Sequence, residues 1–108
     1  MHIASFEGIA LMHIFPQAGW HDTAYIVANA EALIVLRDAI TRALEQETPQ
    51  IASAITNDGE GYDTVIIPHN KEWTKGWNEV ALPYTADMAK ENRENALQPW
   101  KMHRLKVC

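Results

Sequence analysis

The sequence has few of the residues that staple secreted domains or build membrane spans. Its 108 residues include one cysteine, Cys108, so no disulfide can form within the chain. No apolar run approaches the roughly 20 residues that a membrane-spanning helix needs, and no secretory leader pattern is visible. We therefore expect a cytoplasmic protein with no membrane partner.

The common catalytic and cofactor-binding motifs are also missing. Neither of the glycine-rich loops that cradle phosphate occurs, and neither of the two serines lies in a nucleophile elbow. No histidines are paired at helical spacing, as zinc ligands often are. The segment 57–63 resembles a calcium loop, but its sixth and twelfth positions carry the wrong residues. The sequence predicts no metal, no cofactor and no enzymatic activity.

Composition indicates one globular domain over residues 1–108, because 47% of residues are hydrophobic and 21% are charged. Apolar and β-branched runs predict four strands. They span Ile9–Phe15, Thr23–Ala28, Ile51–Thr56 and Tyr62–Pro68. The pair Asp58-Gly59 predicts a tight turn that joins the last two strands into a hairpin.

One helix is predicted between the two pairs of strands. Asn29 is a suitable N-cap, Glu31 faces the positive end of the helix dipole, and Pro49 stops the segment. We expect the helix to span Ala30–Gln46. Its apolar stripe comprises Leu33, Leu36, Ile40, Ala43 and Leu44.

The last third of the chain has weaker patterns. Residues 69–84 show no period and predict an irregular segment. Thr85 is a candidate cap for a polar helix over Ala86–Gln98, which Pro99 would end, and residues 99–108 form an extended tail. The whole pattern predicts an α+β fold: an antiparallel sheet of about four strands (β-β-α-β-β) with one helix packed on it, then an irregular segment and a second polar helix.

Charge is distributed unevenly along the chain. Residues 1–70 carry nine acidic and two basic side chains, whereas residues 71–108 carry five acidic and seven basic ones. Binding to duplex nucleic acid is disfavoured, because it depends on neutralising phosphates. An anionic ligand would meet the second part of the chain. The same distribution also fits ordinary surface charge.

Aromatic and cationic residues gather in the second part of the chain. Aromatic rings stack on nucleobases, and guanidinium groups bind phosphate through paired hydrogen bonds. The candidate ligand-binding residues are Trp73, Trp77, Tyr84, Thr85, Asn92, Arg93, Trp100 and Arg104. The same residues suit a subunit interface equally, and the aromatic rings could instead cover the second face of the sheet.

Four strings of residues resemble a known family. They are Ala24-Tyr-Ile-Val-Ala-Asn29, Glu31-Ala-Leu-Ile-Val-Leu-Arg-Asp-Ala-Ile-Thr-Arg-Ala-Leu44, Asp58-Gly-Glu-Gly-Tyr62 and Leu82-Pro-Tyr-Thr85. Over roughly residues 23–98 the chain resembles the small phage anti-defence sponge proteins that counter the Thoeris system. The resemblance implies a phage-encoded homo-oligomer in the host cytosol. It also implies that the protein sequesters a small nucleotide-like signal, an isomer of cyclic ADP-ribose, without converting it.

Two further functions fit parts of the sequence. The acidic residues before position 70 suit an immunity or inhibitor protein that blocks a protein partner, and such a complex would weaken with salt. A small hydrolase or isomerase would instead use His21, Asp22 and His69, provided that the fold brings these side chains together.

Overall fold

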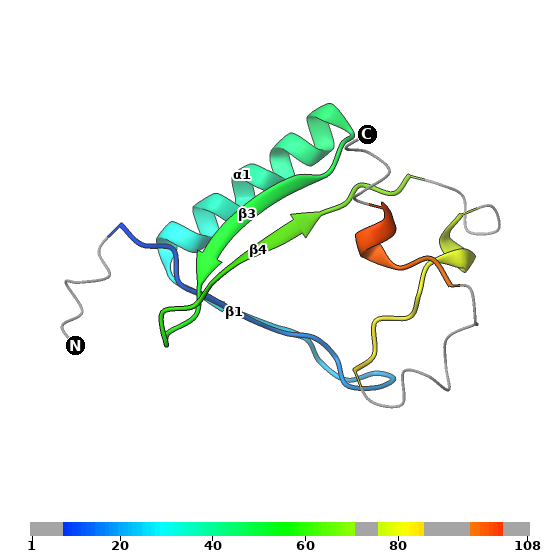
Figure 1. Ribbon diagram of the computed structural model, residues 1–108, viewed down its shortest axis with the longest axis horizontal. Coiled ribbons are helices and arrows are strands. Elements are labelled where there is room, and N and C mark those ends of the chain that lie inside the picture. Colours follow the sequence, from blue (N-terminus) through cyan, green and yellow to red (C-terminus); the bar gives the residue numbers. More distant parts are fainter. Residues whose placement is uncertain (1–7, 71–75, 86–95, 103–108) are drawn as a thin grey trace.

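The computed structural model describes residues 8–70, 76–85 and 96–102, and it shows an α+β fold (Figure 1). The elements are β1 (Met12–Phe15), β2 (Tyr25–Ala28), α1 (Ala30–Gln46), β3 (Gln50–Ile55), β4 (Gly61–Ile66) and a 3-10 turn, η2 (Trp77–Glu79). The predicted α+β class and the β-β-α-β-β order are confirmed. Each strand lies within two or three residues of its predicted bounds.

The helix α1 has the bounds that the sequence predicts. The Asn29 side chain accepts a hydrogen bond from the Ala32 N–H, as an N-cap does. At the other end, Glu47 adopts a left-handed conformation with φ of 55°, and its N–H donates to the Ala43 carbonyl. Local capping chemistry therefore fixes both ends of α1.

The buried face of α1 includes Leu36 and Ala43, as predicted, but not the other three residues of the predicted stripe. In the described part of the chain the buried hydrophobic residues are Met12, Ala32, Leu36, Ala39, Ala43, Ala52 and Ala54. Five of these seven are alanines, so the helix approaches β3 closely along a stripe of small side chains. Leu33, Ile40 and Leu44 were predicted to be buried, but they are exposed. They project to one side of the alanine stripe, where a sheet of two strands is too narrow to cover them.

The single sheet of about four strands is not observed. Instead, β1 pairs with β2 and β3 pairs with β4, each antiparallel, in two separate hairpins. One parallel bridge, Leu11 to Ile55, joins the hairpins, and the Ile55 N–H donates to the Ala10 carbonyl over 2.9 Å. β3 ends where β1 begins, since the chain turns back after Thr56. The strands are therefore staggered end to end and cannot form a longer ladder.

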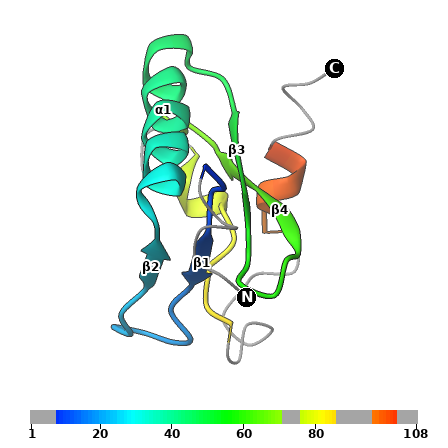
Figure 2. The same ribbon diagram turned by 90° about the vertical axis from the view of Figure 1, so that its left-hand side faces the viewer.

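Two side chains hold the β1 segment in place at this junction: Asn29 joins it to the start of α1, and Tyr62 joins it to β4. Asn29 accepts from the Leu11 N–H at 3.1 Å and donates through Nδ2 to the Ile9 carbonyl at 2.8 Å. The Tyr62 hydroxyl donates to the Met12 carbonyl at 2.6 Å. Beyond this junction the β1–β2 hairpin diverges from the body formed by α1, β3 and β4 (Figures 1 and 2).

Residues 76–85 and 96–102 form a third part of the fold, named here the C-terminal unit. The predicted polar helix mostly falls at residues 86–95, which lie outside the described residues. Leu97 is not helical, because it forms a parallel bridge with Val80. Residues 99–102 are helical where an extended tail was predicted, and Pro99 begins this turn with its φ already set for a helix. Residues 103–108 of the predicted tail lie outside the described residues.

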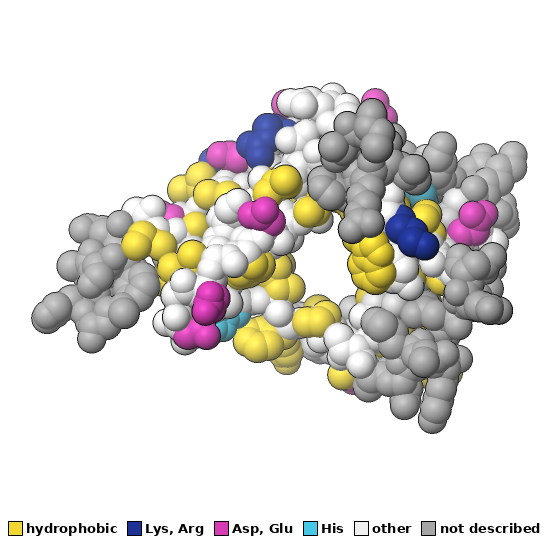
Figure 3. All heavy atoms as spheres, viewed as in Figure 1, with side chains coloured by type: hydrophobic (Ala, Val, Ile, Leu, Met, Phe, Trp, Pro, Cys, Tyr) yellow, Lys and Arg dark blue, Asp and Glu magenta, His cyan; other side chains and the backbone are white. Residues whose placement is uncertain are grey.

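The three parts surround an opening that is visible in the space-filling view (Figure 3). The body, the β1–β2 hairpin and the C-terminal unit lie around it, with hydrophobic side chains at its rim. A hydrogen bond of 3.4 Å from the Thr85 N–H to the Gln17 carbonyl connects the C-terminal unit to the hairpin loop. The radius of gyration is 15.9 Å, whereas about 13 Å is typical of a compact domain of this length.

Candidate functional site

Trp77 is the best-positioned of the predicted ligand-binding rings. Its indole N–H donates to the His69 carbonyl at 2.9 Å, and its ring meets the His69 imidazole edge-on with centroids 5.1 Å apart. The side chain nevertheless stays 46% exposed. A ring whose polar atom is already bonded keeps its orientation, so its free surface forms a fixed platform for stacking.

Backbone pairing brings the segment of Trp100 next to that of Trp77. The Leu97 N–H donates to the Glu79 carbonyl at 2.7 Å, and the Ala81 N–H donates to the Leu97 carbonyl at 2.8 Å. Trp100 then lies in the helical turn that Pro99 begins, and it is 55% exposed. The C-terminal unit therefore carries two partly exposed indoles on adjacent segments.

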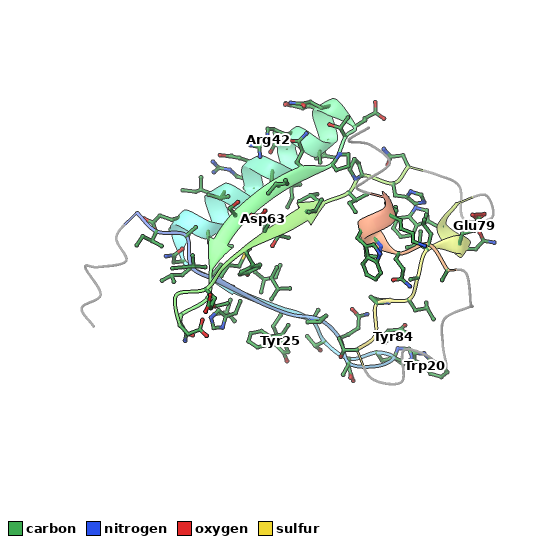
Figure 4. All side chains as sticks on the ribbon, in the orientation of Figure 1. Trp20, Tyr25, Arg42, Asp63, Glu79 and Tyr84 are labelled. Atoms are coloured by element: carbon green, nitrogen blue, oxygen red, sulfur yellow. The ribbon has the colours of Figure 1, made fainter. Side chains whose placement is uncertain are left out.

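The remaining predicted site residues lie elsewhere. Tyr84 is half-buried and lies close to the β1–β2 loop, where Figure 4 also shows Trp20. Thr85 is exposed, and its backbone N–H is bonded to that loop. The structure thus places Tyr84 and Thr85 at the end of the C-terminal unit that meets the hairpin. The residues Trp73, Asn92, Arg93 and Arg104 lie outside the described residues.

His69 contributes a second polar atom beside Trp77. Its Nε2 atom is buried and has no hydrogen-bond partner among the residues that the structure describes. A buried polar atom without a partner costs free energy, about 1–3 kcal/mol. Among the described residues, this atom is therefore an unsatisfied hydrogen-bonding group beside the ring of Trp77.

The glycine-rich turn between β3 and β4 is exposed and acidic. Gly59 has a φ of 90°, which a side chain would strain, so the predicted Asp-Gly turn is confirmed. The Thr56 hydroxyl donates to the Asp58 carboxylate and holds the pKa of that carboxyl below its ordinary value. The backbone N–H of Asn57 donates to Nε2 of His13 at 3.0 Å and links this turn to β1.

A shallow hollow lies on the face of β3 and β4 that points away from α1. It has a volume of about 420 Å³, and its lining includes Ile9, Ser53 and Asp63. The Ser53 hydroxyl donates to the Asp63 carboxylate at 2.7 Å. Among the described residues, no histidine bonds to this pair.

The constellation of His21, Asp22 and His69 is not assembled by any described contact. His21 and Asp22 lie in the β1–β2 loop, and Asp22 accepts a hydrogen bond from the Gly19 N–H. His69 follows β4 and packs on Trp77 instead. Across the described ranges, no three His, Cys, Asp or Glu side chains are close enough to hold a metal ion. Among the same residues, no helix is long and apolar enough to cross a bilayer.

The β1–β2 hairpin forms an apolar surface that the sequence patterns did not predict. Trp20, Tyr25, Ile26 and Val27 are each more than half exposed. The available signal was the unbroken apolar run in β2, which is typical of a strand that is covered on both faces. Here neither face is covered within the described chain.

Comparisons with known protein families, with curated proteins and with solved structures find no match to this chain.

Proposed function

We propose that this chain is a non-enzymatic binding protein that sequesters a small anionic, nucleotide-like ligand as a homo-oligomer. The ligand class is that of a cyclic ADP-ribose isomer, as the resemblance of residues 23–98 to the phage sponge proteins suggests. The observation that carries the proposal is the fixed, half-exposed ring of Trp77 beside the segment of Trp100. Rings that are already oriented lose little conformational freedom when a base stacks on them.

Charge in the same part of the chain supports an anionic ligand. In the described part of the C-terminal unit, Lys101 is an exposed cation next to Trp100. Arg93 and Arg104 follow from the sequence as the groups that would hold phosphate in paired hydrogen bonds. Residues 1–70 carry nine acidic and two basic side chains and residues 71–108 carry five acidic and seven basic ones, so the charge of the second part of the chain favours an anion.

Calorimetry with ADP-ribose as the probe tests the proposal. Replacing Trp100 with alanine should weaken binding by about 5- to 150-fold, because stacking on one base contributes about 1–3 kcal/mol. Ile34→Ala is the control, since Ile34 is 47% exposed on α1, outside the C-terminal unit and the β1–β2 hairpin, and it should leave the affinity unchanged. Equal affinity in Trp100→Ala and in the wild type would remove the stacking assignment.

The fate of the probe tests the non-enzymatic part. Mass spectrometry should recover ADP-ribose intact after a long incubation with the protein, and any conversion product would contradict this part. Replacing Arg93 or Arg104 with alanine should lower the affinity while the circular dichroism spectrum stays unchanged. Failure of the wild type to bind ADP-ribose, cyclic ADP-ribose or any co-purified nucleotide would overturn the proposed function.

A protein-binding module is the second candidate, and the exposed carboxylates of Asp58 and Glu60 at the β3–β4 turn favour it. A stable protein partner whose binding weakens with salt, together with no response to nucleotides, would support this candidate instead.

A further inference from the structure

The β1–β2 hairpin exposes large apolar side chains on both of its faces. On one face, Met12 is buried and Ala28 packs against the same core, but Ile14 and Ile26 continue this face uncovered. The opposite face carries Phe15, Tyr25 and Val27, which are all exposed. The hydrophobic surface of the hairpin thus extends beyond what the chain itself covers.

The exposed apolar area of the hairpin is large for a chain of this size. Phe15, Trp20 and Tyr25 are 49%, 63% and 59% exposed. With aromatic side chains of roughly 150–250 Å², and aliphatic ones counted at the lower value, the hairpin offers about 600 Å² of apolar surface. This surface is divided between the two faces and the loop of the hairpin, so the part next to the β2 edge is the part that strand pairing would cover.

The hydrogen bonds show which backbone groups of β2 face away from β1. The Asn29 N–H donates to the Leu11 carbonyl. In the antiparallel register, the backbone N–H and C=O groups of every second residue, Val27 and Tyr25, therefore also point toward β1. The alternate residues Ala28, Ile26 and Ala24 direct their backbone N–H and C=O groups to the outer edge. The outer edge of β1 fits this pattern, because its Ala10 and Met12 carbonyls bond to the β3–β4 hairpin.

The outer edge of β2 has none of the features that normally protect an edge strand. Residues 24–28 contain no proline and no charged side chain. Figure 2 shows β2 at the outer side of the hairpin, with no described segment beyond it. No described residue bonds to the outward groups of Ile26 and Ala28. Among the residues that the structure describes, nothing occupies this edge, so it can serve as a template for another strand.

We infer that two copies of this chain pair through antiparallel β2 strands, with the two-fold axis at Ile26. A symmetric pair must match outward residues with outward residues, so Ile26 faces Ile26 of the second copy, and Ala24 faces Ala28 on either side. An axis at Val27 would instead pair Ala24 with Ala30, which already belongs to α1. The Ile26 register uses the whole free edge and gives a four-stranded sheet in the order β1-β2-β2-β1.

The same register also matches the side chains. On one face, Ile14 and Ile26 of both copies form a continuous row across the four strands. On the other face, Tyr25 lies opposite Val27 of the second copy, and pairs of an aromatic and a β-branched residue stabilise antiparallel sheets. This interface specifies the homo-oligomer of the proposed function, on whose oligomeric part it rests, but it requires no nucleotide.

Light scattering coupled to gel filtration tests the interface on the full chain. The wild type should be a dimer or a multiple of it. Ile26→Lys should raise the dimer dissociation constant at least tenfold. Ile34→Lys is the matched control, since Ile34 is 47% and Ile26 is 54% exposed, and it should leave the assembly unchanged. A monomeric wild type, or an Ile26→Lys variant that assembles like the wild type, overturns the inference.

A cross-link tests the register without weakening the interface. Opposed residues in a hydrogen-bonded antiparallel pair have Cα atoms about 5.5 Å apart, which a disulfide spans. Ile26→Cys in a Cys108→Ser background should form a covalent dimer on oxidation, whereas Ile34→Cys in the same background should not. Equal cross-linking of the two variants, or none at position 26, contradicts the register.

A proline variant guards against a misfolded lysine variant. Ile26→Pro removes an outward N–H and fixes φ at about −65°, which a strand at the edge of a sheet tolerates. The variant should keep the circular dichroism of the wild type and still abolish the dimer; a folded dimeric Ile26→Pro refutes the pairing. The two proposals also fail separately. A dimer that binds neither ADP-ribose, cyclic ADP-ribose nor any co-purified nucleotide refutes ligand sequestration and leaves the interface standing. A monomer that binds ADP-ribose refutes the interface and the oligomeric part of the proposed function and leaves ligand binding standing.

Discussion

Replacing Asn29 with alanine removes three hydrogen bonds at the point where α1, β1 and β2 meet. The side-chain oxygen of Asn29 accepts from the N–H groups of Ala32, at 2.9 Å, and Leu11, at 3.1 Å. Its amide nitrogen donates to the Ile9 carbonyl at 2.8 Å. All three bonds are partly buried, so water replaces them only incompletely once the side chain is gone.

The expected loss of stability follows from these contacts. Loss of an N-cap costs about 1 kcal/mol, and each of the two remaining bonds contributes about 0.5–1.5 kcal/mol. Asn29→Ala should therefore lower the free energy of unfolding by about 2–4 kcal/mol. Asn29→Ser keeps the cap to Ala32 but cannot span to β1, so it should recover about 1 kcal/mol of this loss.

Urea unfolding followed by far-UV circular dichroism measures both variants. With a slope of about 2 kcal/mol per molar urea, in the middle of the usual range, Asn29→Ala should lower the midpoint by about 1–2 M. The protein concentration must be held constant, because assembly adds to the apparent stability. A loss below about 1 kcal/mol, or identical losses in the serine and alanine variants, would refute the view that Asn29 joins the helix to the first hairpin.

Two further predictions concern titratable groups. Tyr62→Phe should cost about 1 kcal/mol in the same assay by removing the bond to the Met12 carbonyl. Burial raises the pKa of Tyr62. The contribution of the neutral Tyr62 to the free energy of unfolding is therefore complete below its ordinary pKa of about 10 and is lost as the pH rises through the higher folded value. Tyr62→Phe should remove this part of the loss of stability at alkaline pH, and an unchanged alkaline profile would contradict the prediction. The Thr56 hydroxyl lowers the pKa of Asp58. The contribution of the ionised Asp58 carboxylate to stability is therefore present above the ordinary pKa of 3.8 and is lost as the pH falls through the lower folded value. An NMR titration should show the pKa of Asp58 returning toward 3.8 in Thr56→Val, and an unchanged pKa would show that another group causes the shift.

The helix and the β3–β4 turn could be predicted because their signals are local. Asn29, Glu31 and the following apolar spacing define α1 without reference to the rest of the chain. Asp58-Gly59 likewise defines a turn from two adjacent residues. Backbone conformation at these places depends on neighbours within about four positions, so the sequence alone contains the required information.

The buried face of α1 could not be predicted in the same way. Periodicity favoured the large residues Leu33, Ile40 and Leu44, but the helix packs through alanines instead. The choice depends on how closely β3 approaches, and that distance is set by Ala52 and Ala54 on a strand elsewhere in the sequence. A stripe of apolar residues shows that one side of a helix faces the core, but the strands packed against the helix decide which residues of that side are buried.

The candidate site shows a similar limit. The aromatic and cationic composition of the last third pointed to a ligand-binding region, but not to the bond between Trp77 and His69 that orients the ring. The pairing of Leu97 with segment 79–81, which brings Trp100 near, also leaves no local trace in the sequence. Both contacts join residues that no short-range pattern relates.

The sequence by itself determined the order of the elements, the bounds of the helix, the tight turn and the absence of familiar catalytic motifs, because capping, turn and motif chemistry act over a few residues. Only the tertiary structure decided that the strands form two staggered hairpins rather than one sheet, and that the outer edge of β2 pairs with no described strand. Strand pairing joins groups that are distant along the chain, and its outcome depends on where each strand stops relative to the others.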